Sequence, residues 1–127
     1  MQSPAEHRYA QDVELAHGLP RFTRQSTSES PDGTRRRDFE SLEFGVVVEI
    51  DGQLWHVGPA FRSDRRRDRQ AAADGKVTLR AGWVDVTENA CELAIDVTRT
   101  LWQRGWTGKP VPCSAACPVA RLERGTP

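Results

Sequence analysis

The stretch that decides the fold reads Phe44-Gly-Val-Val-Val-Glu-Ile-Asp-Gly-Gln-Leu-Trp-His56. Its three consecutive valines and its isoleucine predict a buried strand, because β-branched side chains fit a pleated, packed surface. Glu49 and Asp51 stand two residues apart, so on a strand both carboxylates project from the same face. Val48 and Ile50 point to the other face. The stretch therefore predicts a central strand that carries two acidic groups at its end.

Glu49 and Asp51 can be interpreted in two ways. Carboxylates side by side at the end of an apolar strand repel each other and lose hydration, which is costly unless a cation compensates. A divalent metal compensates both costs, so Glu49 and Asp51 are candidate metal ligands. The alternative is a plain hairpin turn at Asp51-Gly52, with Glu49 facing solvent on an edge strand.

The composition is that of one soluble globular domain. The chain has 127 residues, of which 37% are hydrophobic and 28% charged, which suffices for a single core. Its 18 basic and 18 acidic residues balance, so it lacks the overall positive field typical of nucleic-acid binders. No apolar run approaches the length of a membrane span and no signal-peptide pattern is present. We therefore expect a cytoplasmic protein with no membrane partner.

Periodicity and turn residues predict the order of the elements. We expect a helix over 4–17, a short strand within 21–27, a strand over 34–39, the central strand, a helix over 60–74, a strand over 76–81 and a helix over 87–104. Thr87 is the expected N-cap of the last helix, and its expected buried face consists of Ala90, Leu93, Ala94, Val97 and Leu101. This order, a helix, a three-strand meander, a helix, a strand and a helix, predicts an α/β fold around a small mixed sheet. Residues 1–106 would form the domain, and residues 107–127 an irregular tail containing Pro, Gly and Cys.

Arginines recur along the predicted helix over 60–74. Arg62, Arg66 and Arg69 are spaced by four and three, so all three can face one groove. Guanidinium groups suit phosphate, which they grip with two hydrogen bonds. A solvated helix with no ligand shows the same pattern.

The three cysteines, Cys91, Cys113 and Cys117, are an odd number in a compartment expected to be reducing, which argues against a disulfide framework. Together they offer three thiolates. A structural zinc site needs a fourth ligand, and His17 and His7 are the candidates. The alternative is that Cys91 packs on its helix while the two tail cysteines are free.

Several motifs together resemble a known superfamily. Asp38 on the second strand and Glu49-Ile50-Asp51-Gly52 on the third are similar to the pattern of the PD-(D/E)XK nucleases, which share a restriction-endonuclease-like core. The closest resemblance is to a bacterial domain family of unknown function that is related to very-short-patch repair endonucleases. It extends over His56, the Arg- and Asp-rich stretch 62–68 and the motif Gly75-Lys-Val-Thr-Leu-Arg80. Motifs at 6–9, 17–20 and 112–118 resemble an actinobacterial branch often attached to AbiEi-type antitoxin winged helices.

The resemblance implies a metal-dependent endonuclease that hydrolyses DNA phosphodiester bonds. In the superfamily, strand carboxylates hold Mg²⁺, which implies that role for Asp38, Glu49 and Asp51. A glutamate of the first helix often joins them, and Glu6 occupies the matching place. The superfamily's lysine is absent, because Asp51 stands at its position. His56 is the candidate for proton transfer in its place, against the alternative of a structural histidine.

The missing lysine and the antitoxin-linked branch leave a second function class open. This is a catalytically degenerate DNA-binding or regulatory module linked to toxin–antitoxin or phage-defence systems. A third option is a remnant of a longer protein. DNA is the expected partner of the first two, and a homodimer or a separate regulatory protein is a further expectation.

Overall fold

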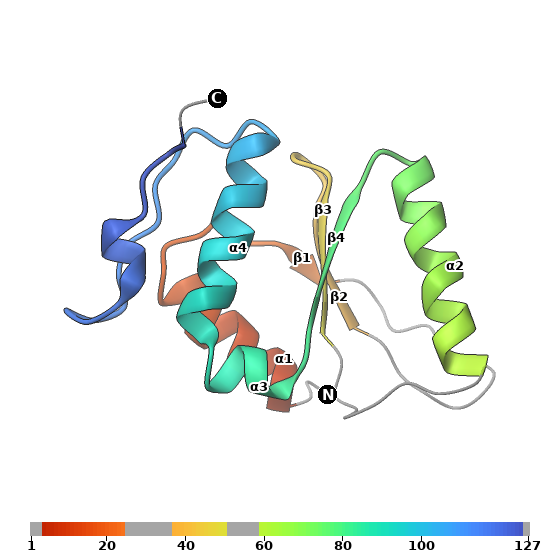
Figure 1. Cartoon of the computed structure of the whole chain (residues 1–127), viewed down its shortest axis with the longest axis horizontal. Coiled ribbons are helices and arrows are strands. Elements are labelled where there is room, and N and C mark those ends of the chain that lie inside the picture. Colours follow the sequence, from red (N-terminus) through yellow and green to blue (C-terminus); the bar gives the residue numbers. More distant parts are fainter. Residues whose placement is uncertain (1–3, 25–36, 51–58, 126–127) are drawn as a thin grey trace.

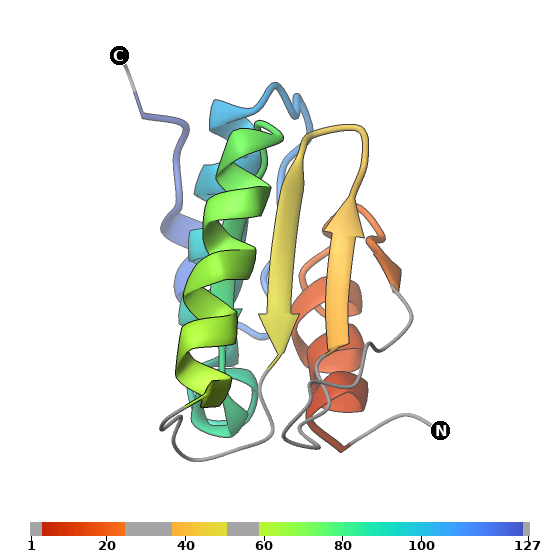
Figure 2. The same cartoon turned by 90° about the vertical axis from the view of Figure 1, so that its right-hand side faces the viewer.

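The computed structural model describes residues 4–24, 37–50 and 59–125, which place one sheet between two layers of helices (Figure 1). The elements in chain order are α1 (Pro4–Arg8), the π-helix η1 (Tyr9–Leu15), β1 (Thr23–Arg24), β2 (Arg37–Ser41), β3 (Val46–Ile50), α2 (Pro59–Ala73), β4 (Val77–Ala81), α3 (Trp83–Thr87), α4 (Ala90–Gln103) and the 3₁₀ helix η2 (Pro118–Arg121). The helix α2 covers one face of the sheet, and the other helices lie on the opposite face (Figures 1 and 2). The predicted α/β fold around a small mixed sheet is confirmed.

The sheet has the strand order β1-β2-β3-β4. The pairs β1–β2 and β2–β3 are antiparallel, whereas β3 and β4 are parallel. A short turn suffices to join an antiparallel pair, but a parallel pair needs a crossover connection. The helix α2 lies in that crossover, which explains why it stands alone on its face of the sheet.

The central strand β3 is buried along its whole length. Val46, Val48 and Ile50 are at most 3% exposed and belong to the core. Val47 and Glu49 alternate with them and line a pocket together with residues of α2, as the period of two in a strand requires. The predicted alternation is therefore confirmed for the described part of this strand.

The predicted start of the last long helix, with Thr87 as its N-cap, is wrong. Thr87 ends the separate helix α3, and α4 begins at Ala90. The Thr87 hydroxyl donates a hydrogen bond to the carbonyl oxygen of Trp83 at 2.7 Å, so it is already engaged inside α3. Asp85 accepts a hydrogen bond from the backbone N–H of Gly82 at 2.8 Å, which stabilises the start of this unpredicted helix.

The buried face predicted for α4 is confirmed. Leu93, Ala94, Val97 and Leu101 are at most 7% exposed, and Ala90 packs against the same core. Their spacing of three and four residues puts them on one stripe of the helix. The strand β2 also continues past its predicted end at Phe39, because Glu40 and Ser41 pair in register with Val47 and Val46.

The C-terminal tail is mostly irregular, as expected, but it contains η2. Cys117 and Val119 are each 3% exposed and join the same core cluster as the strands and α4. The indole Nε1 of Trp102 on α4 donates a hydrogen bond to the carbonyl oxygen of Gly108 at 2.9 Å. The tail therefore packs along α4, and the domain boundary after residue 106 stays a prediction.

One arginine joins the turns at the end of the molecule that carries the β2–β3 connection. Arg104 donates hydrogen bonds to the carbonyl oxygen of Phe44 at 2.9 Å and to that of Gly75 at 2.5 Å.

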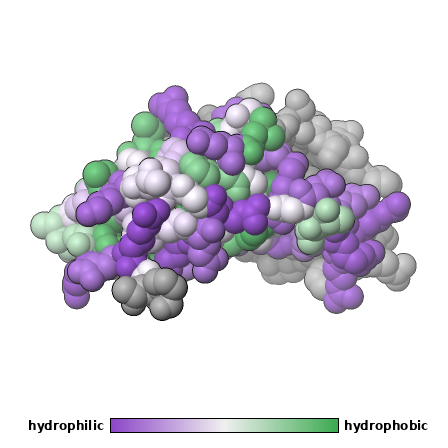
Figure 3. Space-filling model, turned by 90° about the horizontal axis from the view of Figure 1, so that it is seen from above, coloured by the Kyte–Doolittle hydropathy of each residue, from purple (hydrophilic) through white to green (hydrophobic). Residues whose placement is uncertain are grey.

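Figure 3, which views the molecule from above, shows mainly hydrophilic residues around small, separate apolar patches. None of the helices described is both long and apolar enough to cross a membrane.

Candidate functional site

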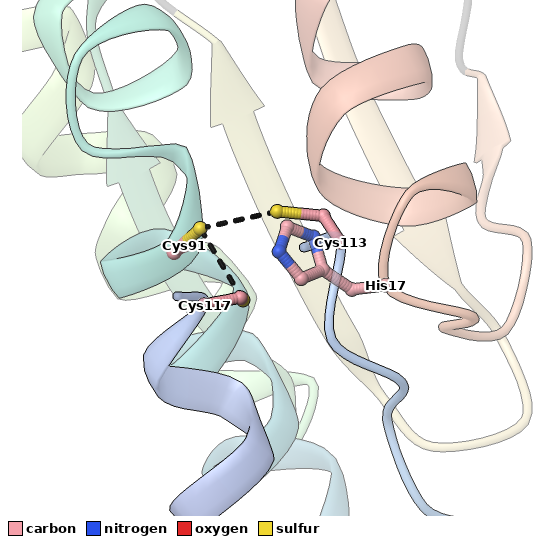
Figure 4. Close-up of side chains that lie close together, drawn as sticks. All are labelled: His17, Cys91, Cys113 and Cys117. Carbon is pink, nitrogen blue, oxygen red and sulfur yellow. Dashed lines mark hydrogen bonds between the residues drawn. The ribbon is translucent and has the colours of Figure 1, made fainter. Parts of the chain in front are cut away.

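Four side chains suited to metal binding converge where η1, α4 and the C-terminal tail meet (Figure 4). They are His17, Cys91, Cys113 and Cys117, and their ligand atoms all lie within 4.8 Å of one another. His17 follows η1, Cys91 lies in the first turn of α4, and the other two cysteines belong to the tail. Segments that are far apart in the sequence thus bring three thiols and one imidazole to the same point.

A backbone hydrogen bond orients the His17 ring. Nδ1 of His17 lies 2.9 Å from the carbonyl oxygen of Val13. Because a carbonyl oxygen can only accept, Nδ1 carries the hydrogen, and in the neutral ring Nε2 keeps its lone pair. Nε2 is buried and has no hydrogen-bond partner among the residues that the structure describes. The ring is therefore held in the tautomer that leaves Nε2 available as a ligand.

The sulfur atoms are too far apart for a disulfide and close enough to share a metal ion. Sγ of Cys91 lies 3.5 Å from Sγ of Cys113 and 3.4 Å from Sγ of Cys117, and all three cysteines are free. A disulfide needs about 2.05 Å between its sulfurs. Two sulfurs bound to one tetrahedral zinc at about 2.3 Å are about 3.8 Å apart. The observed distances are close to this second value.

The thiols differ in acidity because they share one small space. Burial, then the hydrogen bonds with Cys117 and Cys113, raise the pKa of the Cys91 thiol to about 12. Burial acts to raise the pKa of Cys117, but hydrogen bonds with the backbone of Cys113 and Val119 and with the thiols of Cys91 and Cys113 together lower that pKa to about 6.

Backbone contacts bring the tail cysteines to His17. The N–H of Val111 donates a hydrogen bond to the carbonyl oxygen of His17 at 2.8 Å. Gly18 has a φ of 63°, and a Cβ at this position would lie 3.0 Å from Cγ2 of Val111, so glycine permits the close approach. The chain then turns, with the N–H of Cys117 bonded to the carbonyl oxygen of Ser114 at 3.1 Å.

The cluster resolves the choice that the sequence left open for the fourth ligand. His17 joins the three cysteines, whereas His7 is exposed on α1. The cluster of one histidine and three cysteines could bind a metal such as zinc.

A second group of charged residues lies on the face of the sheet that α2 covers. The register places Asp38 on β2 directly opposite Glu49 on β3, and Glu49 opposite Arg80 on β4. Glu49 is only 6% exposed. Nη2 of Arg80 lies 4.0 Å from Oε2 of Glu49 and donates a hydrogen bond to Asp68 of α2 at 2.8 Å. Arg80 thus joins the central strand to the arginine-rich helix.

The sequence did not predict that Arg80 and Lys76 would pair with acidic residues on this face of the sheet. Nζ of Lys76 lies 2.8 Å from Oε2 of Glu40, and the hydrogen bond with Glu40 raises the pKa of Lys76. A signal for Arg80 was present, since the alternation of β4 places it on the face opposite the core. Its partner depended on the strand register, which no local pattern gives.

The structure describes only some of the other predicted site residues. Asp51 and His56 lie outside the described residues, as do the side chains of Asp38 and Arg62. Arg66 and Arg69 are exposed on α2. Glu6 is fully buried in α1, which lies on the face of the sheet opposite α2 (Figure 1). The structure thus leaves the predicted convergence of Asp38, Glu49 and Asp51 untested.

The sequence reasoning also did not single out Glu14, a second buried acid in the N-terminal helices. Glu14 is 5% exposed, and one of its oxygens lies 3.4 Å from the backbone N–H of Phe22, which donates to it. Burial raises the pKa of Glu14 to about 7, against smaller opposing effects of Phe22, Tyr9 and Arg21. Tyr9 is fully buried, and its pKa is also raised, first by burial and then by Glu14.

Comparisons with protein-family models, with curated proteins and with solved structures found no match.

Proposed function

We propose that this chain is a metal-dependent nuclease-like domain of the PD-(D/E)XK kind that hydrolyses phosphodiester bonds of DNA. One observation carries the proposal: the register sets Asp38 directly opposite Glu49 at the end of the central strand. Residues directly opposite each other on an antiparallel pair share a face of the sheet. This is the relationship that two carboxylate ligands of one cation require.

The topology supports the same proposal. The chain runs through a helical segment, three antiparallel strands, a helix and a parallel fourth strand, in the order that the resemblance to this superfamily leads us to expect. In the proposal, Asp38, Glu49 and Asp51 hold the cation with carboxylate oxygens, the ligands that Mg²⁺ prefers. His56 moves the proton. Glu6 lies in α1, on the opposite face of the sheet (Figure 1), and is therefore not among these ligands.

When bound, the ion would supply an activated water and would stabilise the charge that develops on phosphorus. The protein's own residues position the nucleic acid. Carboxylates repel phosphate, so cationic side chains must flank them. Arg66 and Arg69 are exposed on α2, the helix whose Asp68 is bonded to Arg80 beside Glu49. These exposed guanidinium groups are therefore suited to bind the backbone next to the acidic group.

A second candidate function is a module that binds DNA without cutting it. The ion pairs on this face favour it, because Arg80 lies beside Glu49 and Lys76 beside Glu40. A cation already supplied by the protein reduces the negative charge that attracts a metal ion. The absence of the superfamily's lysine points in the same direction.

A plasmid-nicking assay separates the two functions. The full chain is incubated with supercoiled DNA, with magnesium either added or omitted. Omission is preferable to chelation, because a chelator would also remove a metal ion bound to the cysteine cluster. The test variant is Glu49→Gln, which keeps the size of the side chain and removes its charge. Its matched control is Glu88→Gln, which alters an exposed glutamate at the end of α3.

Nicking that requires magnesium, is lost in Glu49→Gln and persists in Glu88→Gln supports the nuclease. Binding of DNA without nicking supports the second function. A chain that neither binds nor nicks DNA contradicts both.

A further inference from the structure

We propose that His17, Cys91, Cys113 and Cys117 bind one zinc ion, which fixes the C-terminal tail to the helices on the face of the sheet opposite α2. The donor set carries the inference, since three sulfur atoms and one imidazole nitrogen lie within 4.8 Å of one another. Such donors select zinc over magnesium and calcium, which prefer oxygen. The proposal is independent of any nuclease activity.

The histidine gives a second, independent observation. His17 donates its Nδ1 hydrogen to the carbonyl oxygen of Val13, and metal-binding histidines commonly donate their second ring nitrogen in this way. Nε2 is left buried, without a hydrogen-bond partner in the described part of the chain. A buried nitrogen with a free lone pair is costly, and coordination of a cation removes this cost.

The number of ligands indicates the role of the ion. Four protein ligands complete a tetrahedral zinc site, whereas catalytic zinc keeps one position open for water or substrate. The cluster is therefore suited to a structural site. The sheet also separates it from the acidic residues beneath α2 (Figure 1), so the two sites are expected to act independently.

Such an ion would give the tail a further connection to the rest of the domain. Its only regular element in the described residues is the short helix η2, and its buried anchors are Cys117 and Val119. Zinc would connect this segment to residues 17 and 91 and close long loops of the chain. Binding energy released at such a site is available to stabilise the fold.

Metal analysis of the full chain tests the proposal directly. The protein is purified with a thiol reductant and without chelator, and metals are measured by mass spectrometry. We expect about one zinc ion per chain. His17→Gln and Cys113→Ser should lose it, while the controls His7→Gln and Ser114→Ala should retain it. The side chains of His7 and Cys113 are both exposed, so Cys113→Ser should still fold.

X-ray absorption of the wild-type protein gives a result that does not depend on any variant. Three sulfurs at about 2.3 Å and one nitrogen at about 2.0 Å from zinc would support the site. Protein without zinc after purification and after addition of zinc would overturn the proposal. So would zinc bound through other ligands, seen as full occupancy in both His17→Gln and Cys113→Ser.

Limited digestion with trypsin tests the role of the ion in holding the tail. Arg121 lies in η2, so cleavage after it reports opening of the tail. Removal of zinc with a chelator should accelerate this cleavage roughly tenfold, because local opening exposes the bond. Re-addition of zinc should restore the slow rate. An unchanged rate, with zinc removal verified by metal analysis, would overturn the proposed structural role.

Discussion

Arg104, at the end of α4, donates a hydrogen bond from Nε to the carbonyl oxygen of Phe44, 60 residues earlier in the chain. Its Nη2 also donates to the carbonyl oxygen of Gly75. One side chain thus satisfies acceptors in the β2–β3 turn and in the turn between α2 and β4. These two turns stand at the same end of the sheet, and α4 supplies the group that connects them.

We expect Arg104→Ala to lower the free energy of unfolding by about 1–2 kcal/mol, the usual effect of losing hydrogen bonds to a charged donor. Arg99→Ala is the matched control, because Arg99 is an exposed arginine on the same helix. It should change the stability by less than about 0.5 kcal/mol. Urea unfolding of both variants measures the difference, and equal effects would contradict a specific role for Arg104.

Gly45→Ala should cost more stability than Gly75→Ala. Both glycines have positive φ, 68° and 78°, so alanine costs about 1 kcal/mol at either position. A Cβ at Gly45 would also lie 2.7 Å from Nη2 of Arg104, whereas a Cβ at Gly75 has nothing within 4 Å. The added methyl group must displace the guanidinium group and break its hydrogen bonds.

The same experiment in an Arg104→Ala background isolates this effect. Without the guanidinium group, the two glycine substitutions should cost the same. A persistent excess for Gly45→Ala in that background would show that another contact is responsible. The double-mutant cycle is measured by urea unfolding, as for the single variants.

Glu14 should make the stability depend on pH. Its pKa is raised from 4.5 to about 7 by burial, so the folded protein holds this proton more tightly than the unfolded chain. The resulting stabilisation is complete below about pH 4.5 and is lost as the pH rises through about 7. Its size is about 3 kcal/mol for a shift of this extent.

Glu14→Gln removes the titration and keeps an oxygen that can accept from Phe22. Relative to the wild type, the variant should therefore gain about 3 kcal/mol between pH 4.5 and pH 8. Glu88→Gln, at an exposed position, should show no such trend. Thermal or urea unfolding across this range measures both, and a constant difference between Glu14→Gln and the wild type would contradict the raised pKa.

Replacing Arg66 and Arg69 with Gln should weaken DNA binding by a similar factor for different sequences, because phosphate contacts carry no sequence information. Each lost contact should reduce the slope of log K against log salt by about 0.9. The control is Arg99→Gln with Arg121→Gln, two exposed arginines on elements on the other side of the sheet. Fluorescence titrations at several salt concentrations measure the slopes. If the test and control variants have the same slope, α2 is a solvated face.

Much of the fold follows from local patterns in the sequence. The valine run predicted the buried part of β3, and the spacing of Leu93, Val97 and Leu101 predicted the buried face of α4. Both predictions rest on periods of two and 3.6 residues, which depend only on the backbone. The start of α4 was missed because the Thr87 hydroxyl bonds inside a preceding helix, a choice between two local structures that the sequence pattern allows equally.

The candidate sites could be predicted only in part, because their residues come from segments that are far apart in the sequence. The sequence by itself determined the types of ligand, three thiols with a histidine in one cluster and carboxylates on the central strand in the other. Only the tertiary structure decided that His17 rather than His7 joins the cysteines, and that Arg80 lies beside Glu49. Side-chain type and periodicity are properties of neighbouring residues, whereas these contacts depend on how η1, α4 and the tail pack and on which register β3 and β4 adopt.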